Sequence, residues 1–345
     1  MRYSLLSRFQ GALLGVALGD RLGFEYPIQQ QLQAKVAVTG SLFPLHQLAL
    51  PKQQLDCNPQ TQEIQPVLSA SSAGKLAAYY AEKLIRQGGW YAPEGEAVLF
   101  LSSEAQSKSQ SNRETAALGA ELAIATLPIA LFFHDDEVKL RQTIKKALKE
   151  QGHSELQYGA LAIGFAIAQA LKERLDPLHL IPHVITYLQE QNLPPDVYVD
   201  LINKLKQGQT LLQERSNLHA AIRTLLPSNC FGSGNGEIAL ALFCFLSTPE
   251  DMHLSMCRAA RCGNSSRIIS ALTGALSGAY NSSAEAFLEW DLVVTDSARI
   301  LDGQISASEV CQLAARLLAI WSGADDSASS SISLAIAAPG IIRPR

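Results

Sequence analysis

Two segments far apart in the chain carry the side chains that could do chemistry. The first is Gly19-Asp20-Arg21-Leu22-Gly23, in which one carboxylate lies between two glycines. The second is Gly263-Asn264-Ser265-Ser266-Arg267, in which amide and hydroxyl oxygens precede a guanidinium. Oxygen ligands hold hard cations such as magnesium, whereas a guanidinium holds carboxylates and phosphates. If the two segments meet, these residue types indicate a polar site for a metal ion or an anion.

Small residues at helical spacing adjoin both segments and indicate how they are positioned. Gly11, Gly15 and Gly19 are four apart in the first helical stretch, and Gly274 and Gly278 follow the second segment beside alanines on similar spacing. Small residues four apart make one helix face smooth, so two helix backbones can approach closely. We therefore expect these two helices to pack together and to bring the polar segments to one place.

Helical periodicity dominates the rest of the chain. No stretch alternates polar and apolar residues for long enough to predict a sheet, so the expected fold class is all-α, a compact multi-helix orthogonal bundle. The stretches with helical spacing are 2–19, 69–87, 114–133, 136–150, 155–173, 177–192, 235–247, 250–262, 264–279 and 306–321. We expect one helical domain over residues 1–321 and a flexible Ser/Ala-rich tail over residues 322–345.

Segments rich in Gln, Ser, Pro or Gly predict the loops. The predicted loops are 29–70, 104–114, 193–196 and 228–236. The last of them contains Gly232, Ser233 and Gly234, where the backbone could approach a ligand closely.

Composition limits the compartment and the partners. The chain has 345 residues, of which 47% are hydrophobic and 17% charged, and this favours a large buried helical core. A net charge of -4 without a Lys/Arg run argues against binding to nucleic acid. Six cysteines without a CxxC pair, and an N-terminus without a signal-peptide cleavage pattern, predict reduced thiols in a cytoplasmic protein. Residues 116–133 could span a membrane by length, but Glu121 and Pro128 within them predict a core helix and no transmembrane segment.

Together these features resemble the ADP-ribosylglycohydrolase family. Its members carry a GALxGxAxGDxxG opening, which residues 11–23 match, and a late GGDTDTIxAIxGAL segment, which residues 262–276 resemble in altered form. Residues 76–89, 151–154 and 239–246 resemble further helical parts of the family. The resemblance implies the family's helical fold over most of the chain.

The resemblance also implies a chemistry against which the residues can be compared. The family uses a binuclear magnesium site to hold and polarise ADP-ribose while water attacks the anomeric carbon. Its TDDT motif falls on Ser71-Ser72-Ala73-Gly74 and its GDTDT motif on Gly263-Asn264-Ser265-Ser266-Arg267, so the matched aspartates are replaced by uncharged residues. Neutral oxygens alone do not offset the dehydration of magnesium, and Lys75 and Arg267 add cations. We therefore expect no magnesium, no other cofactor and no metal-binding residue.

These replacements predict a catalytically inactive family member that acts as a binding, scaffold or assembly protein. We expect a protein partner, and an anion such as ADP-ribose in the former cleft, where the Arg267 guanidinium would take the place of the lost metals. In a competing interpretation, Arg267 only fills and neutralises the old pocket. The candidate ligand-binding residues are Asp20, Ser71, Ser72, Gly232, Ser233, Gly234, Asn264, Ser265, Ser266 and Arg267.

Other functions stay open at this point. The chain could still hydrolyse ADP-ribosyl N- or O-glycosidic bonds without magnesium, with Asp20 and Glu25 as catalytic residues, or it could be a purely structural subunit. A serine hydrolase is disfavoured because no nucleophile-elbow pattern surrounds Ser233 and no histidine lies in a triad context. His179 and His183 are four apart, but a proline disturbs the turn between them and no further metal ligand lies nearby in the sequence.

Overall fold

The computed structural model describes residues 3–39, 72–90, 118–150, 152–153, 156–190, 195–226, 234–283 and 307–324. Within these ranges the chain forms helices joined by turns, without a β-strand, so the predicted all-α fold is confirmed. The helices are α1 (Leu5–Thr39), α2 (Ser72–Gln87), α4 (Leu118–Ala125), α5 (Leu127–Phe132), α6 (Glu137–Glu150), α7 (Gln157–Leu171), α8 (Leu180–Gln189), α9 (Pro195–Gln213), α10 (Leu218–Leu225), α11 (Asn235–Ser247), α12 (Met252–Ala259), the 3-10 turn η3 (Gly263–Ser265), α13 (Ser266–Asn281) and α15 (Ala307–Ser322).

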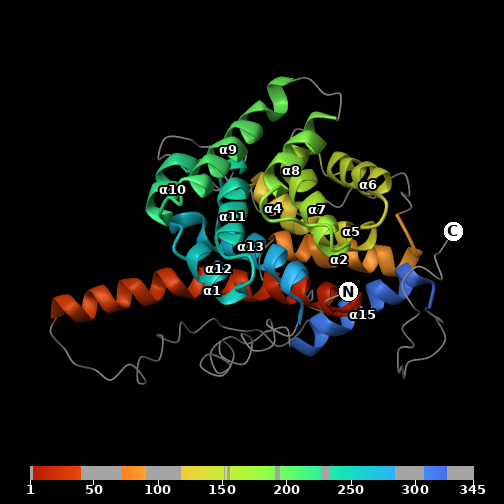
Figure 1. The fold of residues 1–345 in the computed structure, drawn as a ribbon. Coiled ribbons are helices and arrows are strands. Elements are labelled where there is room, and N and C mark those ends of the chain that lie inside the picture. The colour runs from red at the N-terminus through yellow and green to blue at the C-terminus, as the bar shows by residue number, and fades with distance from the viewer. Residues whose placement is uncertain are drawn as a thin grey trace.

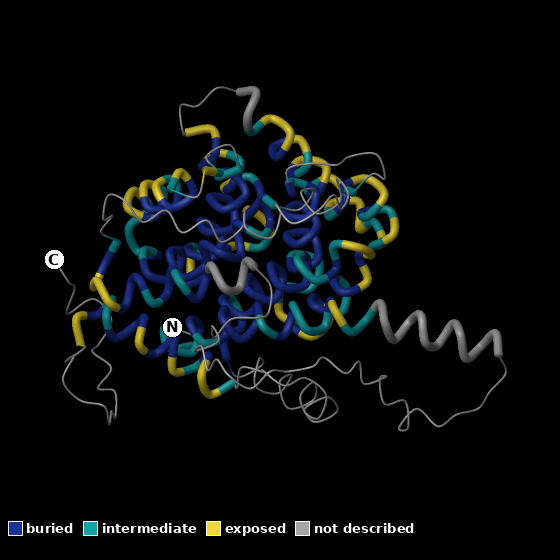
Figure 2. The backbone as a smooth tube through the Cα atoms, turned by 180° about the vertical axis from the view of Figure 1, so that it is seen from behind, coloured by how far each residue is buried: buried dark blue, intermediate teal, exposed yellow. Residues whose placement is uncertain are grey.

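Helices α1 and α13 form the central pair of this arrangement. Figure 1 shows α1 along the base of the molecule with α13 beside it, and α7, α11 and α12 pack against α13. The outer helices α6, α8, α9 and α10 cover α7 and α11. Buried residues lie in the interior that the described helices enclose, and exposed residues lie on the outer faces of these helices and at the turns (Figure 2).

The glycines of α1 and α13 bring the two helices together, as their spacing predicts. A Cβ on Gly15 would overlap the carbonyl oxygen of Gly274, and a Cβ on Gly274 would overlap that of Gly15. Gly11 meets Gly278 in the same way, and Gly19 meets Ser270. These pairs run in opposite directions along the two helices, so the helices are antiparallel. The residues that follow Gly19 therefore lie against the start of α13.

The segment that the sequence predicts as one core helix over 114–133 is broken into α4 and α5. Both helices are almost entirely buried, which confirms a core position. The break lies at Thr126, whose carbonyl oxygen accepts hydrogen bonds from the amides of both Ile129 and Ala130. Pro128 has no amide hydrogen, so the regular pattern of helical hydrogen bonds cannot continue through it. Among the described helices, none is both long and apolar enough to cross a bilayer.

Two other expectations differ from the structure. Helix α1 continues to Thr39, through residues 29–39 that the sequence places in a loop. Extending an established helix costs far less than starting one, and this segment is rich in Gln and also contains Ala, Leu and Lys, all of which favour helix. Helices α9 and α10 were not predicted, because their polar residues leave only a narrow apolar stripe, which includes Leu201 and Leu205 and is buried in the fold.

The described cysteines agree with the prediction of thiols in or near the core. Cys244 and Cys262 are buried, Cys257 and Cys311 are half-buried, and none of these four described cysteines is in a disulfide bond. The other two cysteines and the tail beyond residue 324 lie outside the described residues.

Candidate functional site

The two polar segments of the sequence meet where α1 passes the first turn of α13. A Cβ on Gly23 would come within 2.5 Å of the Cα of Arg267, so only glycine allows this approach. The buried Ser266 hydroxyl donates a hydrogen bond of 2.7 Å to the carbonyl oxygen of Gly23. Residues separated by more than two hundred positions in the sequence thus touch through backbone and side chain.

An ion pair between Asp20 and Arg267 joins the two helices beside this contact. Arg267 Nε donates to Asp20 Oδ1 at 2.5 Å and Arg267 Nη2 donates to Asp20 Oδ2 at 2.8 Å. The side chains retain 37% (Arg267) and 16% (Asp20) of their exposure. The hydrogen bonds to Asp20 and its negative charge raise the pKa of Arg267, and the Glu121 carboxylate acts in the same direction. Both carboxylate oxygens of Asp20 are therefore bound to a fixed internal cation.

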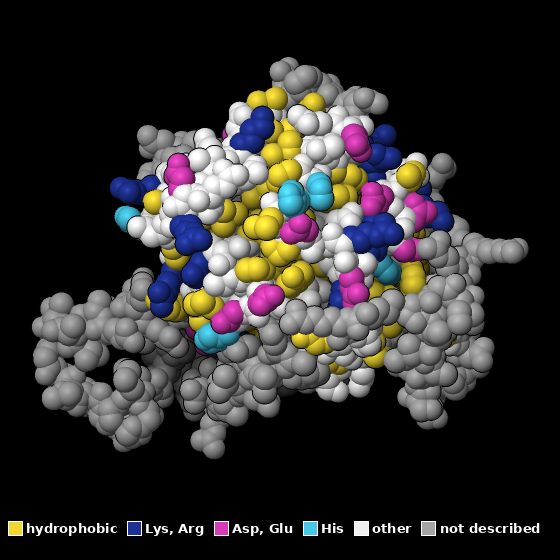
Figure 3. Space-filling view, viewed as in Figure 1, with side chains coloured by type: hydrophobic (Ala, Val, Ile, Leu, Met, Phe, Trp, Pro, Cys, Tyr) yellow, Lys and Arg dark blue, Asp and Glu magenta, His cyan; other side chains and the backbone are white. Residues whose placement is uncertain are grey.

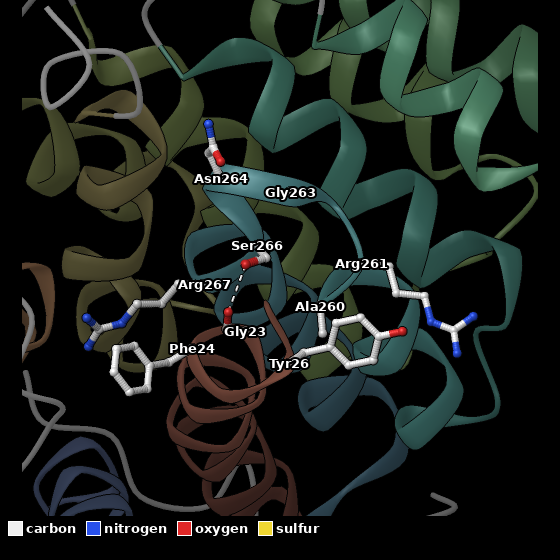
Figure 4. Close-up of a pocket in the computed structure, with 9 residues that line it drawn as sticks. All are labelled: Gly23, Phe24, Tyr26, Ala260, Arg261, Gly263, Asn264, Ser266 and Arg267. Atoms are coloured by element: carbon white, nitrogen blue, oxygen red, sulfur yellow. Dashed lines mark hydrogen bonds between the residues drawn. The ribbon is translucent and has the colours of Figure 1, made fainter. Parts of the chain in front are cut away.

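A pocket of about 410 Å³ lies at this junction. Figure 4 shows Arg267 and Phe24 on one side of the Gly23–Ser266 contact, and Arg261 and Tyr26 on the other. The Arg267 guanidinium carbon is 5.8 Å from the centre of the Phe24 ring, and that of Arg261 is 5.6 Å from the centre of the Tyr26 ring. The pocket is lined by Gly23, Phe24, Tyr26, Ala260, Arg261, Gly263, Asn264, Ser266 and Arg267.

A buried carboxyl group, Glu237, lies next to the pocket segment. The Ser265 hydroxyl donates to Glu237 Oε1 at 3.1 Å, and Glu237 is only 7% exposed. Burial raises the pKa of Glu237, against the opposing effect of the hydrogen bond from Ser265. Ser265 thus links the first turn of α11 to the start of α13.

The structure brings together four of the predicted ligand-binding residues. Asn264, Ser266 and Arg267 line the pocket at the α1–α13 junction, and Asp20 joins them through its ion pair with Arg267 without lining the pocket itself. Ser265 contacts Glu237 and is also absent from the pocket lining. The Asp20 carboxylate is paired, and Ser266 uses its hydroxyl on the backbone. The polar groups of Asp20 and Ser266 are therefore already bound within the protein.

The remaining predicted residues lie elsewhere or outside the described structure. Glu25 accepts a hydrogen bond of 2.9 Å from Arg21 on its own helix. Gly234 precedes α11, with a φ of 83° that favours glycine. Ser71, Gly232 and Ser233 lie outside the described residues, as does the side chain of Ser72, the first residue of α2.

Sequence reasoning missed four residues of this region: Phe24, Tyr26, Arg261 and Glu237. The position of Glu237 could have been noticed, because an acidic residue in the first turn of a helix, directly after a glycine-rich loop, is stabilised by the helix dipole. Arg261 and the two aromatic residues adjoin the polar segments in sequence, but only the fold shows that they face one pocket.

The described part of the chain contains no group of three or more His, Cys, Asp or Glu side chains placed to hold a metal ion. His179 and His183, which the sequence disfavours as a metal-binding pair, are both exposed, with their ring centroids 6.2 Å apart and His179 Nδ1 2.6 Å from Asp176 Oδ2. On the face drawn in Figure 3, acidic and basic side chains are interspersed and do not form a patch of one sign.

Comparison with known proteins identifies what this arrangement is similar to. The family model described as ADP-ribosylglycohydrolase matches residues 1–292. No curated protein gives a significant match. Among solved structures, one titled "ADP-ribosylglycohydrolase-related protein complex" has a similar fold, with a TM-score of 0.52 and 19% identity over 91% of this chain and 97% of that chain.

Proposed function

Because the chain belongs to the ADP-ribosylglycohydrolase family, we propose that it is a member that binds a ligand or partner in the old cleft without hydrolysing a glycosidic bond. The observation that carries this proposal is the ion pair between Asp20 and Arg267. The carboxylate that survives from the family's opening motif is held by a cation that belongs to the chain itself. Asp20 is therefore available neither as a metal ligand nor as a base.

Magnesium does not fit the residues at this junction. It requires several oxygen ligands in near-octahedral geometry, and anionic oxygens to offset its dehydration. Both oxygens of Asp20 accept hydrogen bonds from Arg267, and the guanidinium would repel a divalent cation. The positions that the resemblance assigns to the other aspartates hold the uncharged residues Ser72, Ala73, Asn264 and Ser266.

Binding without metal suits the same residues better. A pocket of about 410 Å³ is large enough for part of a small organic ligand, and two arginines and two aromatic rings line it. ADP-ribose has an anionic pyrophosphate and a flat base, so it is the first ligand to test. Acidic groups of a protein partner are a second source of the same charge, in keeping with a scaffold or assembly role.

The test is a titration of the purified protein with ADP-ribose, with magnesium and separately with EDTA, followed by calorimetry and thermal unfolding. We expect binding in EDTA and no release of ADP-ribose from an ADP-ribosylated protein or small glycoside. A ligand at 100 times its Kd stabilises by about 2.7 kcal/mol, which is a shift of a few degrees for a chain of this size. Binding that requires magnesium would show that the site still holds a metal ion. Turnover that Asp20→Asn abolishes would show that the site is still catalytic.

A charge-reversal variant links the binding to the site. Arg267→Asp should lower the free energy of unfolding, because it places a second carboxylate next to that of Asp20. Arg223→Asp is the matched control, because Arg223 is exposed on α10 and does not line the pocket. If neither parent nor variants bind ADP-ribose, the ligand part of the proposal fails.

A further inference from the structure

The two arginines of the pocket are not equivalent. Arg267 is bound to both oxygens of Asp20, so its charge is already neutralised. Arg261 is exposed, in the turn after α12, and forms no ion pair within the part of the chain that the structure describes. The positive charge that the pocket can offer to a ligand therefore comes from Arg261.

Tyr26 positions this second guanidinium. The Arg261 guanidinium carbon lies 5.6 Å from the centre of the Tyr26 ring, within the range of a cation–π contact. Figure 4 shows both side chains on the same side of the pocket, opposite Arg267. A guanidinium held against a ring keeps its N–H groups free for a planar or tetrahedral anion, and loses less side-chain entropy when the anion binds.

We propose that Arg261 and Tyr26 form the anion-binding site of this pocket, and that its ligand is a small phosphate-bearing molecule with a flat ring, bound without a metal ion. The phosphate would take the N–H groups of Arg261. The flat ring would lie on the opposite side of the pocket from Arg261, against the Phe24 ring, which is 49% exposed. This inference rests on the proposed function, because it assumes a binding pocket that works without metal, but it assigns the charge recognition to a residue other than Arg267.

The size and charge of the pocket favour a small molecule over a protein segment. The volume of about 410 Å³ falls in the range of ligand pockets. A single unpaired guanidinium next to ring faces matches one phosphate and one ring, which is the composition of a mononucleotide. An acidic protein surface would instead be expected to meet several cations.

AMP is the appropriate probe, measured by calorimetry in EDTA, with inorganic phosphate and adenosine as separate arms. AMP carries a phosphate and a ring but lacks the second sugar at which a glycohydrolase acts, so its binding reports the pocket independently of catalysis. We expect AMP to bind, and each part alone to bind at least tenfold more weakly. Adenosine binding as tightly as AMP would overturn the role of the anion, and phosphate binding as tightly as AMP would overturn the role of the ring.

Two variants of the same helix end isolate the residue. Arg261→Gln removes the pocket guanidinium, and Arg258→Gln removes the same charge three residues earlier, from a side chain that does not line the pocket. Loss of a charge-assisted hydrogen bond should weaken AMP binding by about tenfold or more in Arg261→Gln, and by less than threefold in Arg258→Gln. Equal effects in both variants, or none in Arg261→Gln, would overturn the proposal.

A ring variant tests the second half of the site. Tyr26→Phe keeps the ring and should retain AMP affinity, whereas Tyr26→Leu should lose it, with thermal unfolding used to confirm that both variants fold. Failure of this inference is distinguishable from failure of the proposed function. If ADP-ribose binds in EDTA but AMP does not, or if Arg261→Gln has no effect on metal-free binding, only the present inference fails.

Discussion

The ion pair between Asp20 and Arg267 should contribute measurably to stability, and unequally for its two partners. Arg267→Gln leaves Asp20 without its cation at a position where its side chain is only 16% exposed. Asp20→Asn leaves Arg267, which is 37% exposed and can turn its guanidinium toward water. Breaking a fully buried pair costs about 3–5 kcal/mol, and an exposed pair contributes about 0–1 kcal/mol. This partly buried pair lies between those limits.

We therefore expect Arg267→Gln to lower the free energy of unfolding by about 2 kcal/mol and Asp20→Asn by about 1 kcal/mol. The bidentate geometry should give a coupling energy of about 1.5 kcal/mol, so the double variant should cost about as much as the mean of the two single variants. Urea unfolding followed by circular dichroism measures all four proteins, and repetition in 1 M salt should reduce the coupling only in part, because the pair is half-buried.

Two results would refute this reasoning. A coupling energy below about 0.3 kcal/mol would mean that the two side chains do not act as a pair in solution. A larger loss for Asp20→Asn than for Arg267→Gln would mean that the unequal exposure does not control the cost. Either result would also remove the main support for a neutralised cleft.

Three further predictions concern the α1–α13 junction and the buried Glu237 carboxyl group next to it. Gly15→Ala should destabilise the protein by about 3 kcal/mol or more, because the new Cβ would overlap the carbonyl oxygen of Gly274. Gly208→Ala in α9, where the nearest atom to the new Cβ would be 3.8 Å away, should instead stabilise the protein by about 0.5–1 kcal/mol. Equal effects of the two variants in urea unfolding would contradict the close helix contact. Ser266→Ala should cost about 1 kcal/mol in the same assay, because the buried carbonyl oxygen of Gly23 loses its donor, and an unchanged midpoint would contradict this. Glu237→Gln should stabilise the protein at neutral pH, because burial raises the pKa of Glu237, so the folded state loses stability as pH rises from the ordinary pKa of glutamate through the raised one. Unfolding midpoints of parent and variant should converge toward about pH 4, and a parent that gains stability with pH relative to the variant would show the opposite sign.

Much of the fold could be predicted from local patterns. Apolar residues at helical spacing located most of the helices, and the glycine and alanine spacing predicted the close α1–α13 contact, because steric fit along a helix face is a local property. Pro128 was noted in a core helix, but the break at Thr126 was not predicted. Helices α9 and α10 were not predicted because their apolar residues are few, and these residues are buried only because α9 and α10 pack against α11 in the fold.

The site was less predictable than the fold. Asp20 and Arg267 were both identified as candidates, but the sequence left open whether the guanidinium faces a ligand or fills the pocket. The structure pairs them at 2.5 and 2.8 Å, and places Arg261 and Tyr26, which the sequence did not single out, on the other side of the same pocket. The position of Glu237 after the glycine-rich loop is visible in the sequence, but nothing in its local sequence indicates how deeply its side chain is buried.

The sequence by itself determined the residue types available to this protein: helical periodicity, a glycine contact surface, and uncharged residues where the family resemblance places carboxylates. Only the tertiary structure decided which charges are matched within the chain and which face solvent. The reason is physical, because helix formation and small-residue packing depend on neighbours a few positions away. The environment of a charge depends instead on groups brought close from anywhere in the chain, as Asp20 and Arg267 are across the antiparallel contact of α1 and α13.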